Sequence, residues 1–210
     1  MIRKAILLDL DDTIFPVRSI DQTTFEPFLN DFISRLQDFY DPMVIEKIIE
    51  ELWSEPVGFV TDKYSIPIEI VRESFQFFNH SDFVLNIMPY PDYKYVKQLS
   101  VQKFLVTDGI TGLQTAKIEA LGIGHDFDEI VINDPFEDSR SKKDIFMDLV
   151  KKYNLKQEQT FVIGDNPESE IEAGNSLNMI TVRIVRNGEI TQVKKANYHI
   201  KSFRDLEAII

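Results

Sequence analysis

The sequence predicts an α/β protein with a Rossmann-like parallel sheet, helices on both faces of that sheet, and an inserted all-helical cap domain. Three observations predict this fold. Short apolar runs recur without polar alternation, as expected of strands buried on both faces of a parallel sheet. Stretches with helical periodicity separate most of these runs, as βαβ connections require. A long segment after the first run has helical periodicity and no convincing strand.

The first expected strand covers residues 5–8 and ends at Asp9. Further strands are expected at 104–106, 129–132, 161–163, 180–185 and 198–200. The first four of the six all end in polar residues, namely Asp9, Thr107, Asn133-Asp134 and Gly164-Asp165. Ligands of open α/β sheets bind beyond the carboxyl ends of the strands. The strand ends therefore predict the location of a site.

Helices are expected at 113–121, 146–153 and 166–177, between the later strands. Gly122 offers a C-terminal stop for the first, and Asn178 a left-handed cap for the third. Asn166, followed by Pro167 and an acid, is typical of a helix start. The apolar stripe of the first helix consists of Leu113, Ala116, Ala120 and Leu121.

The segment 15–88 is expected to be the helical cap. It carries broad apolar stripes at helical spacing, and prolines punctuate its ends and turns. The expected division is an α/β core domain of residues 1–14 and 89–210 and a cap domain of residues 15–88. The aromatic residues are expected mainly to fill the cores of the two parts.

Composition excludes several classes of function. The net charge of −12 disfavours binding to nucleic acid or to anionic lipid. The absence of cysteine excludes disulfides, thiolate metal sites and thiol catalysis. No apolar run approaches the roughly 18 residues of a membrane helix, and the sequence enters its first strand without a signal peptide. A cytoplasmic location and no membrane partner are therefore expected.

The strongest chemical motif is Asp9-Leu10-Asp11-Asp12-Thr13 at the end of the first strand. Mg²⁺ prefers hard oxygen ligands and needs only one or two carboxylates. A carboxylate can also attack phosphorus as a covalent nucleophile, a role assigned to Asp9. Asp11 would protonate the leaving oxygen and then deprotonate water. The alternative is that Asp-Asp-Thr forms only a turn or a helix cap.

Two further motifs suit a phosphate group. Thr107-Asp108-Gly109 follows a core strand, and its hydroxyl and backbone amides could hold phosphate oxygens, although such a sequence is often just a turn. Lys142 or Lys143 could offset the phosphate charge. Lys142 is preferred, but spacing does not decide between the two, and the alternative is a solvated pair.

The last motif is Gly164-Asp165, with Glu170 five residues after Asp165. Gly164 allows a sharp turn at the strand end. Asp165 would face the same cleft as Asp9 if their strands are neighbours, which makes it a candidate Mg²⁺ ligand. Glu170 could touch a metal-bound water or orient Lys142; alternatively it is a surface acid favoured by the helix dipole.

Together these motifs resemble the haloacid dehalogenase-like (HAD) hydrolase superfamily, in order and strand placement over nearly the whole chain. The insert resembles the helical cap of that family's first subclass. The resemblance implies that the first strand lies between the second and fourth. It also implies residue roles: Asp9 as nucleophile and metal ligand, Asp11 as acid/base with its carbonyl on the metal, Thr107 and the amides of Asp108 and Gly109 on phosphate, Lys142 on the phosphoryl group, and Asp165 and Glu170 at the metal.

Three departures from the family pattern stand out. Asp108 replaces the usual Asn and adds negative charge, no proline follows Lys142, and Glu170 replaces the usual Asp.

The predicted function is Mg²⁺-dependent hydrolysis of a small phosphomonoester through an aspartyl-phosphate. Asp11 favours this reaction, because dehalogenases of the superfamily lack an aspartate two places after the nucleophile. A sugar phosphomutase using the same residues stays open as an alternative. A phosphorylatable switch or a catalytically silent binding protein is the alternative from another class. A monomer or a homodimer is expected.

Overall fold

The computed structural model describes residues 4–53, 55, 57–80, 83–137, 140–186 and 196–210. Its centre is a six-stranded sheet in the order β3-β2-β1-β4-β5-β6, and every neighbouring pair is parallel. The strands are β1 (Ala5–Leu8), β2 (Gln102–Asp108), β3 (Glu129–Asn133), β4 (Thr160–Gly164), β5 (Ile180–Ile184) and β6 (Tyr198–Ile200). All six expected strands are confirmed, as is the central position of β1 between β2 and β4.

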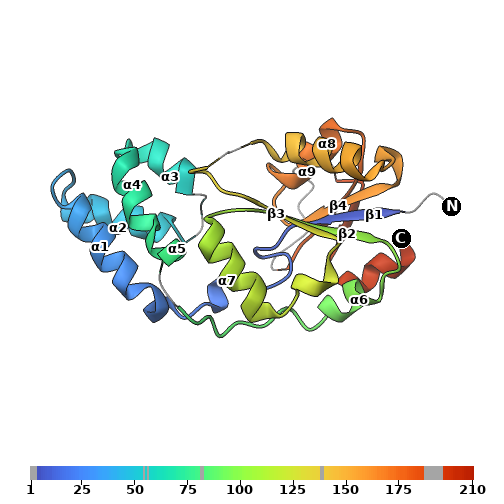
Figure 1. The fold of residues 1–210 in the computed structure, drawn as a ribbon, viewed down its shortest axis with the longest axis horizontal. Coiled ribbons are helices and arrows are strands. Elements are labelled where there is room, and N and C mark those ends of the chain that lie inside the picture. The colour runs from blue at the N-terminus through green and yellow to red at the C-terminus, as the bar shows by residue number, and fades with distance from the viewer. Residues whose placement is uncertain (1–3, 54, 56, 81–82, 138–139, 187–195) are drawn as a thin grey trace.

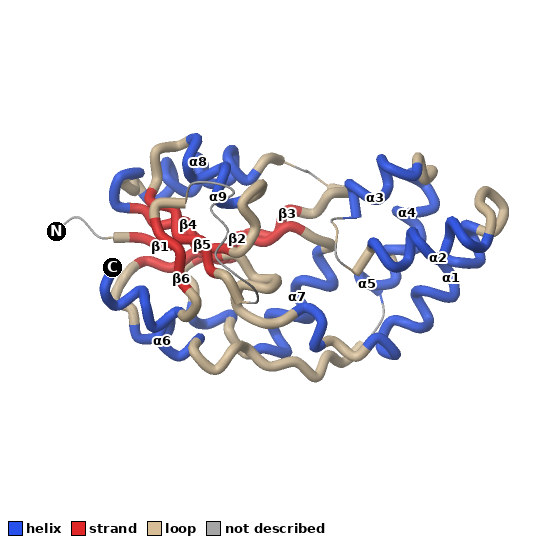
Figure 2. Tube along the Cα trace, turned by 180° about the vertical axis from the view of Figure 1, so that it is seen from behind, coloured by secondary structure: helices blue, strands red, loops and turns tan. Residues whose placement is uncertain are grey.

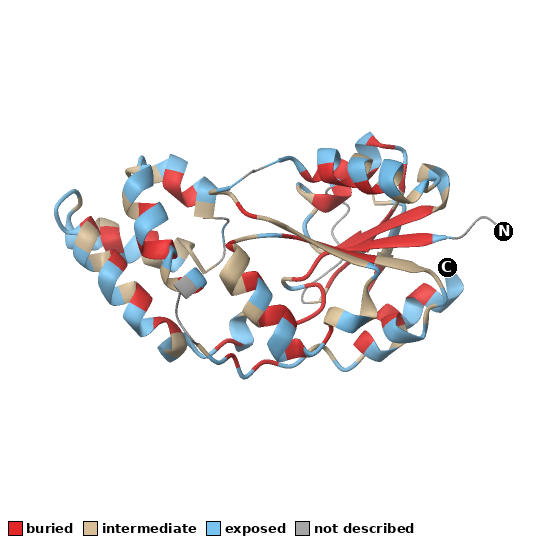
Figure 3. Ribbon diagram, in the orientation of Figure 1, coloured by how far each residue is buried: buried red, intermediate tan, exposed pale blue. Residues whose placement is uncertain are grey.

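Helices cover both faces of this sheet (Figure 1). On one face lie α8 (Lys142–Tyr153) and α9 (Glu170–Ser176); on the other lie α7 (Thr111–Leu121), α6 (Tyr93–Gln98) and the 3₁₀ segment Phe203–Ala208. Ala5 and Leu7 pack with the α8 and α9 side, whereas Ile6 and Leu8 pack with the other side. Figure 3 shows the resulting buried strands between the two layers of helices. The all-parallel sheet follows from this burial on both faces.

The insert after β1 forms α1 (Glu26–Leu36), α2 (Pro42–Glu51), α3 (Val57–Tyr64), α4 (Ile68–Phe75) and α5 (Phe77–His80), preceded by short 3₁₀ turns. We call α1–α5 the cap helices. They gather at the end of the molecule away from the chain termini (Figures 1 and 2). The described residues between 16 and 88 contain no strand, as predicted. The domain boundaries themselves stay a prediction. No helix in the described part of the chain is long and apolar enough to cross a membrane.

Aromatic rings pack in the space between the cap helices. The ring of Phe28 lies 4.7 Å from that of Phe75 and 4.8 Å from that of Phe78, centroid to centroid. Such contacts supply much of the apolar burial that a small helical layer needs. The cap core is continuous with the core on the α7 side of the sheet, so the two parts share one apolar interior.

The cap touches the core most closely at the start of α7. The side-chain oxygen of Asn79 accepts a hydrogen bond from the amide of Gly112 at 2.9 Å. A Cβ atom at position 112 would overlap the carbonyl oxygen of Phe78. Glycine is therefore required here by the close approach of α5, and this contact fixes one side of the cap over the strand ends.

Two helix predictions were wrong in detail. The third predicted helix begins at Glu170 and not at residue 166, because Asn166 accepts from the amide of Glu168 in a separate turn. On α7 the predicted apolar stripe marks the buried face only in part: Leu121 is buried and Leu113 and Ala116 pack against the core, but Ala120 is exposed. The residues of α7 that are buried are Gln114, Lys117, Ile118 and Leu121. The predicted stop at Gly122 is confirmed, since this residue caps α7, and the predicted left-handed conformation of Asn178 is also confirmed.

Candidate active site

Asp9 follows β1 directly, at the carboxyl edge of the sheet. Its amide donates to the carbonyl of Ile163 on β4 at 3.0 Å, which continues the strand pairing by one residue. The chain then turns back: Asp12 adopts a left-handed conformation with φ of 52°, and Asp11 forms an isolated bridge with Phe15. This turn keeps both Asp9 and Asp11 beside the strand ends.

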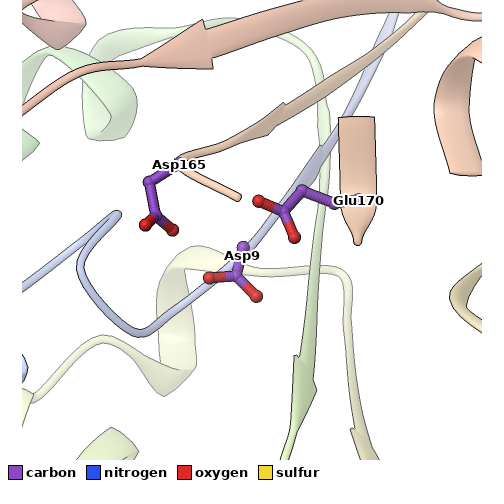
Figure 4. A group of neighbouring side chains, drawn as sticks. All are labelled: Asp9, Asp165 and Glu170. Carbon is purple, nitrogen blue, oxygen red and sulfur yellow. The ribbon is translucent and has the colours of Figure 1, made fainter. Parts of the chain in front are cut away.

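Three carboxylates from different segments converge at this edge (Figure 4). Asp9, Asp165 and Glu170 each offer an oxygen, and these oxygens lie within 4.8 Å of one another. Glu170 reaches the group because it packs directly on Gly164, where a Cβ atom would overlap its carboxylate. The amide of Asn166 donates to its Oε1 at 2.7 Å. The predicted meeting of Asp9 with Asp165 and Glu170 is therefore present in the structure.

Burial shifts the pKa values of Asp9 and Asp165. Desolvation raises the pKa of Asp9 well above its usual value, the charges of Glu170 and Asp165 raise it further, and Lys142 offsets part of the rise. Desolvation also raises the pKa of Asp165 to about 7, with contributions from Glu170 and Asp12. Packed acids of this kind disfavour their own ionised forms, and a hard divalent cation relieves this. The donor set thus fits Mg²⁺.

Lys142 occupies the other side of Asp9. Its Nζ donates to Oδ1 of Asp9 at 2.7 Å and to Oε2 of Glu170 at 3.1 Å. Burial alone would lower the pKa of Lys142, but the carboxylates of Asp9, Glu170 and Asp108 outweigh it and raise the pKa. Lys143 is exposed. Of the two candidate lysines, Lys142 is the one beside the acids.

Asp108 is partly neutralised in this arrangement. Its Oδ1 accepts from Nδ2 of Asn133 at 2.6 Å, and its Oδ2 lies 3.5 Å from Nζ of Lys142. Its side chain is 43% exposed, so it borders the site and is not enclosed in it. The negative charge of Asp108 is therefore stabilised by one amide donor, Asn133, and by one cation, Lys142.

Thr107 is the last residue but one of β2 and is buried beside the same cleft. Its Oγ1 accepts from Nε2 of Gln114 at 2.6 Å, which leaves the hydroxyl proton to be donated elsewhere. The amide of Gly109 donates to the carbonyl of Asn133 at 3.1 Å, so it already has an acceptor within the protein. Phosphate binding by Thr107, Asp108 and Gly109 stays a prediction.

Sequence analysis missed two side chains that hold Asp11. Nζ of Lys117 donates to both carboxylate oxygens of Asp11 at 2.9 Å, and Nε2 of Gln114 donates to Oδ2 at 3.1 Å. Both residues project from the buried face of α7. The spacing 114, 117, 118 and 121 is that of one helix face, but two of these residues are polar, so an apolar pattern does not mark it.

A family model described as haloacid dehalogenase-like hydrolase matches residues 3–178. The chain belongs to this family. The match runs from β1 through α9, and so it includes every residue of the site described above. In this HAD-like hydrolase, the acidic strand ends and Lys142 lie where the sequence motifs predict.

Curated relatives match this chain along nearly its whole length. A protein of Methanocaldococcus jannaschii named glyceraldehyde 3-phosphate phosphatase is 27% identical, over 99% of this chain and 96% of the relative. A protein of the same name from Methanopyrus kandleri is 25% identical, over 92% of this chain and 88% of the relative.

Solved structures share the fold. A HAD phosphatase from Thermococcus onnurineus superposes with a TM-score of 0.64 at 18% identity, covering 98% of this chain and 97% of that one. An L-2-haloacid dehalogenase from Xanthobacter autotrophicus gives a TM-score of 0.60 at 13% identity, covering 100% and 98%. The fold alone therefore does not separate phosphatase from dehalogenase chemistry.

A cavity of about 590 Å³ opens between the strand ends of this hydrolase and its cap helices. The core side is polar and contains the acids, Thr107 and the two buried lysines. The cap side is largely apolar and includes Phe25, Leu29 and Trp53, together with the charged residues Arg18 and Glu55. The core side carries six carboxylates against two lysines, so it suits an anionic ligand only together with a bound cation.

Proposed function

We propose that this HAD-like hydrolase is a Mg²⁺-dependent phosphatase that acts on a small phosphomonoester through an aspartyl-phosphate on Asp9. One observation carries the proposal: the buried Asp9 carboxylate is bonded to Lys142 on one side and lies within 4.8 Å of the Asp165 and Glu170 oxygens on the other. A nucleophilic carboxylate between a fixed cation and a cluster of hard oxygen ligands suits attack on an anionic phosphorus centre.

In the first step a carboxylate oxygen of Asp9 attacks phosphorus. A bond forms between that oxygen and phosphorus, and the bond between phosphorus and the ester oxygen breaks. Asp11 gives its proton to the departing oxygen, so that an alcohol leaves. Lys142 holds the other carboxylate oxygen, Oδ1, at 2.7 Å, and its charge offsets the negative charge that gathers on the phosphoryl group.

In the second step water attacks the phosphorus of the aspartyl-phosphate. Asp11, now a carboxylate, takes a proton from this water, the bond from phosphorus to Asp9 breaks, and inorganic phosphate leaves. Both steps use the same two aspartates in sequence. The cap helices above the cavity would limit access of bulk water while the intermediate persists.

Asp9, Asp165 and Glu170, with the backbone carbonyl of Asp11, are the proposed holders of Mg²⁺. The ion would supply positive charge at the phosphate group when bound. Thr107 is the proposed donor to a phosphate oxygen, because its hydroxyl oxygen already accepts from the amide of Gln114 and its proton is left to donate.

Asp11 favours a phosphatase over a dehalogenase. Cleavage of a carbon–halogen bond releases halide, which needs no proton, whereas an alkoxide leaving group does. The names of the curated relatives point in the same direction and suggest glyceraldehyde 3-phosphate as the first substrate to test.

The test is release of inorganic phosphate from glyceraldehyde 3-phosphate and from a panel of sugar phosphates, nucleotides and phosphorylated glycolytic acids, with Mg²⁺ and with EDTA. We expect Mg²⁺-dependent release from at least one of them, and none with Asp9→Asn. An isomerised phosphate ester without phosphate release would instead indicate the mutase. Mg²⁺-independent hydrolysis, or full activity of Asp9→Asn, would contradict the proposal.

A further inference from the structure

Asp11 is the proposed proton donor, so the orientation of its carboxylate decides how well the proton is transferred. It lies in a tight turn, and its side chain is 31% exposed. A carboxylate that must reach a leaving oxygen within hydrogen-bonding distance loses efficiency when it samples other rotamers. Whatever holds its two oxygens therefore controls the proton transfer.

Lys117 provides that hold. Its side chain is 6% exposed, and its Nζ lies 2.9 Å from both oxygens of Asp11. The ammonium also lies 5.8 Å from the centre of the Phe15 ring, the residue whose backbone pairs with Asp11. A buried lysine is costly unless it is paired, and the Asp11 carboxylate is the partner that the structure gives it.

Gln114 connects Asp11 to the phosphate side of the site. The residue is 1% exposed, and its Nε2 lies 2.6 Å from Oγ1 of Thr107, 3.1 Å from Oδ2 of Asp11 and 3.3 Å from the carbonyl of Asp108. One buried amide thus bridges the acid/base and the end of β2. Gln114 and Lys117 are three residues apart on α7, so one rigid helix face carries both.

The geometry points to Lys117 and Gln114 as positioning residues that aim Asp11 at the leaving oxygen. Lys117 also stabilises the negative charge that Asp11 acquires as its proton moves to that oxygen. Lys142 is already bonded to Asp9 and Glu170, so Lys117 serves the acid/base while Lys142 serves the nucleophile. This inference rests on the proposed phosphatase function.

The experiment uses leaving groups of different quality. A p-nitrophenolate leaves without help, whereas an alkoxide needs the proton of Asp11. We therefore compare the rate of the first step, measured by rapid quench in a single turnover, on p-nitrophenyl phosphate and on the best alkyl phosphate substrate. Lys117→Met is expected to lose about 10²-fold or more on the alkyl ester and less than about tenfold on the aryl ester, given the usual contribution of general acid catalysis.

Two further variants separate positioning from simple structural support. Lys117→Arg keeps a cation with parallel donors and is expected to recover most of the alkyl-ester rate. Lys143→Met makes the same charge change at an exposed position and is expected to leave both rates unchanged. If Lys117→Met does not fold, Lys117→Gln, which removes the charge but keeps a polar group at the buried position, is tested in its place and should show the same selective loss.

An equal loss on both esters, or no loss on either, would overturn the inference while leaving the phosphatase function intact. Failure of the wild-type protein to hydrolyse either ester would instead contradict the proposed function itself.

Discussion

Raising the pH in the absence of magnesium is expected to destabilise the folded protein. The raised pKa of Asp165, in the acidic cluster, sets the size of this effect. Burial and neighbouring carboxylates raise the pKa of Asp165 to about 7, from an ordinary value of 3.8. A carboxyl with a raised pKa binds a proton more tightly when folded than when unfolded. Its contribution to stability is complete below the unfolded pKa and is lost as the pH rises through the folded pKa.

Each pH unit across that window is worth 1.36 kcal/mol, so Asp165 alone accounts for about 4 kcal/mol between pH 3.8 and pH 7, and about 2.7 kcal/mol between pH 5 and pH 7. Magnesium acts in the opposite direction, because it binds the ionised cluster. At a fixed concentration, about 100 times its Kd at pH 8, it should stabilise the fold by about 2.7 kcal/mol at pH 8 and by much less at pH 5, where its affinity is lower.

Urea unfolding followed by circular dichroism from pH 5 to pH 8, in EDTA and in Mg²⁺, measures both effects. Asp165→Asn is the matched control, because it keeps the shape of the side chain and removes its titration. In EDTA it should reduce the loss of unfolding free energy between pH 5 and pH 7 by about 2.7 kcal/mol. A variant profile parallel to that of the wild-type protein would refute the assigned proton, and equal Mg²⁺ stabilisation at pH 5 and pH 8 would refute the metal site.

Three other substitutions follow from the contacts. Lys142→Met leaves the acids of the site without their buried cation, so it should lower the unfolding free energy in EDTA by about 3–5 kcal/mol and activity by about 10²-fold or more, whereas Lys143→Met should change neither. Gly112→Ala forces a Cβ into the carbonyl of Phe78 and should cost about 1–3 kcal/mol in urea unfolding, whereas Gly58→Ala, with open space around it, should be neutral or slightly stabilising. Arg186→Met removes a partly buried pair with Asp92 at 2.7 Å and should cost about 1–3 kcal/mol, with a change below about 1 kcal/mol counting against that pair as a stabilising contact.

The sheet could be predicted from the sequence because its strands are apolar on both faces. Residues such as those of β1 have no polar alternation, and that pattern suits little else than a central parallel strand. The location of the site could also be predicted, because the carboxyl ends of neighbouring parallel strands bring Asp9 and Asp165 to one edge of the sheet. The preference for Lys142 also agrees with the structure, although sequence spacing alone did not separate it from Lys143.

The rest depended on tertiary contacts that sequence patterns do not encode. The sequence Asn166-Pro167-Glu168 has the composition of a helix start, but α9 begins only at Glu170, whose carboxylate packs against Gly164. Lysine on a helix is normally expected in solvent, so Lys117 was overlooked. Its burial makes sense only when Asp11, 106 residues earlier in the chain, is known to lie opposite.

The central claim is that Asp9 becomes phosphorylated. The most direct measurement is mass spectrometry of acid-quenched Asp11→Asn protein after incubation with Mg²⁺ and p-nitrophenyl phosphate, whose leaving group needs no proton. Without the base for the second step, the account predicts a phosphoryl group on the peptide that contains Asp9, and no such group when Asp9→Asn is added. A phosphoryl group on another residue, or continued phosphate release by the double variant, would contradict it.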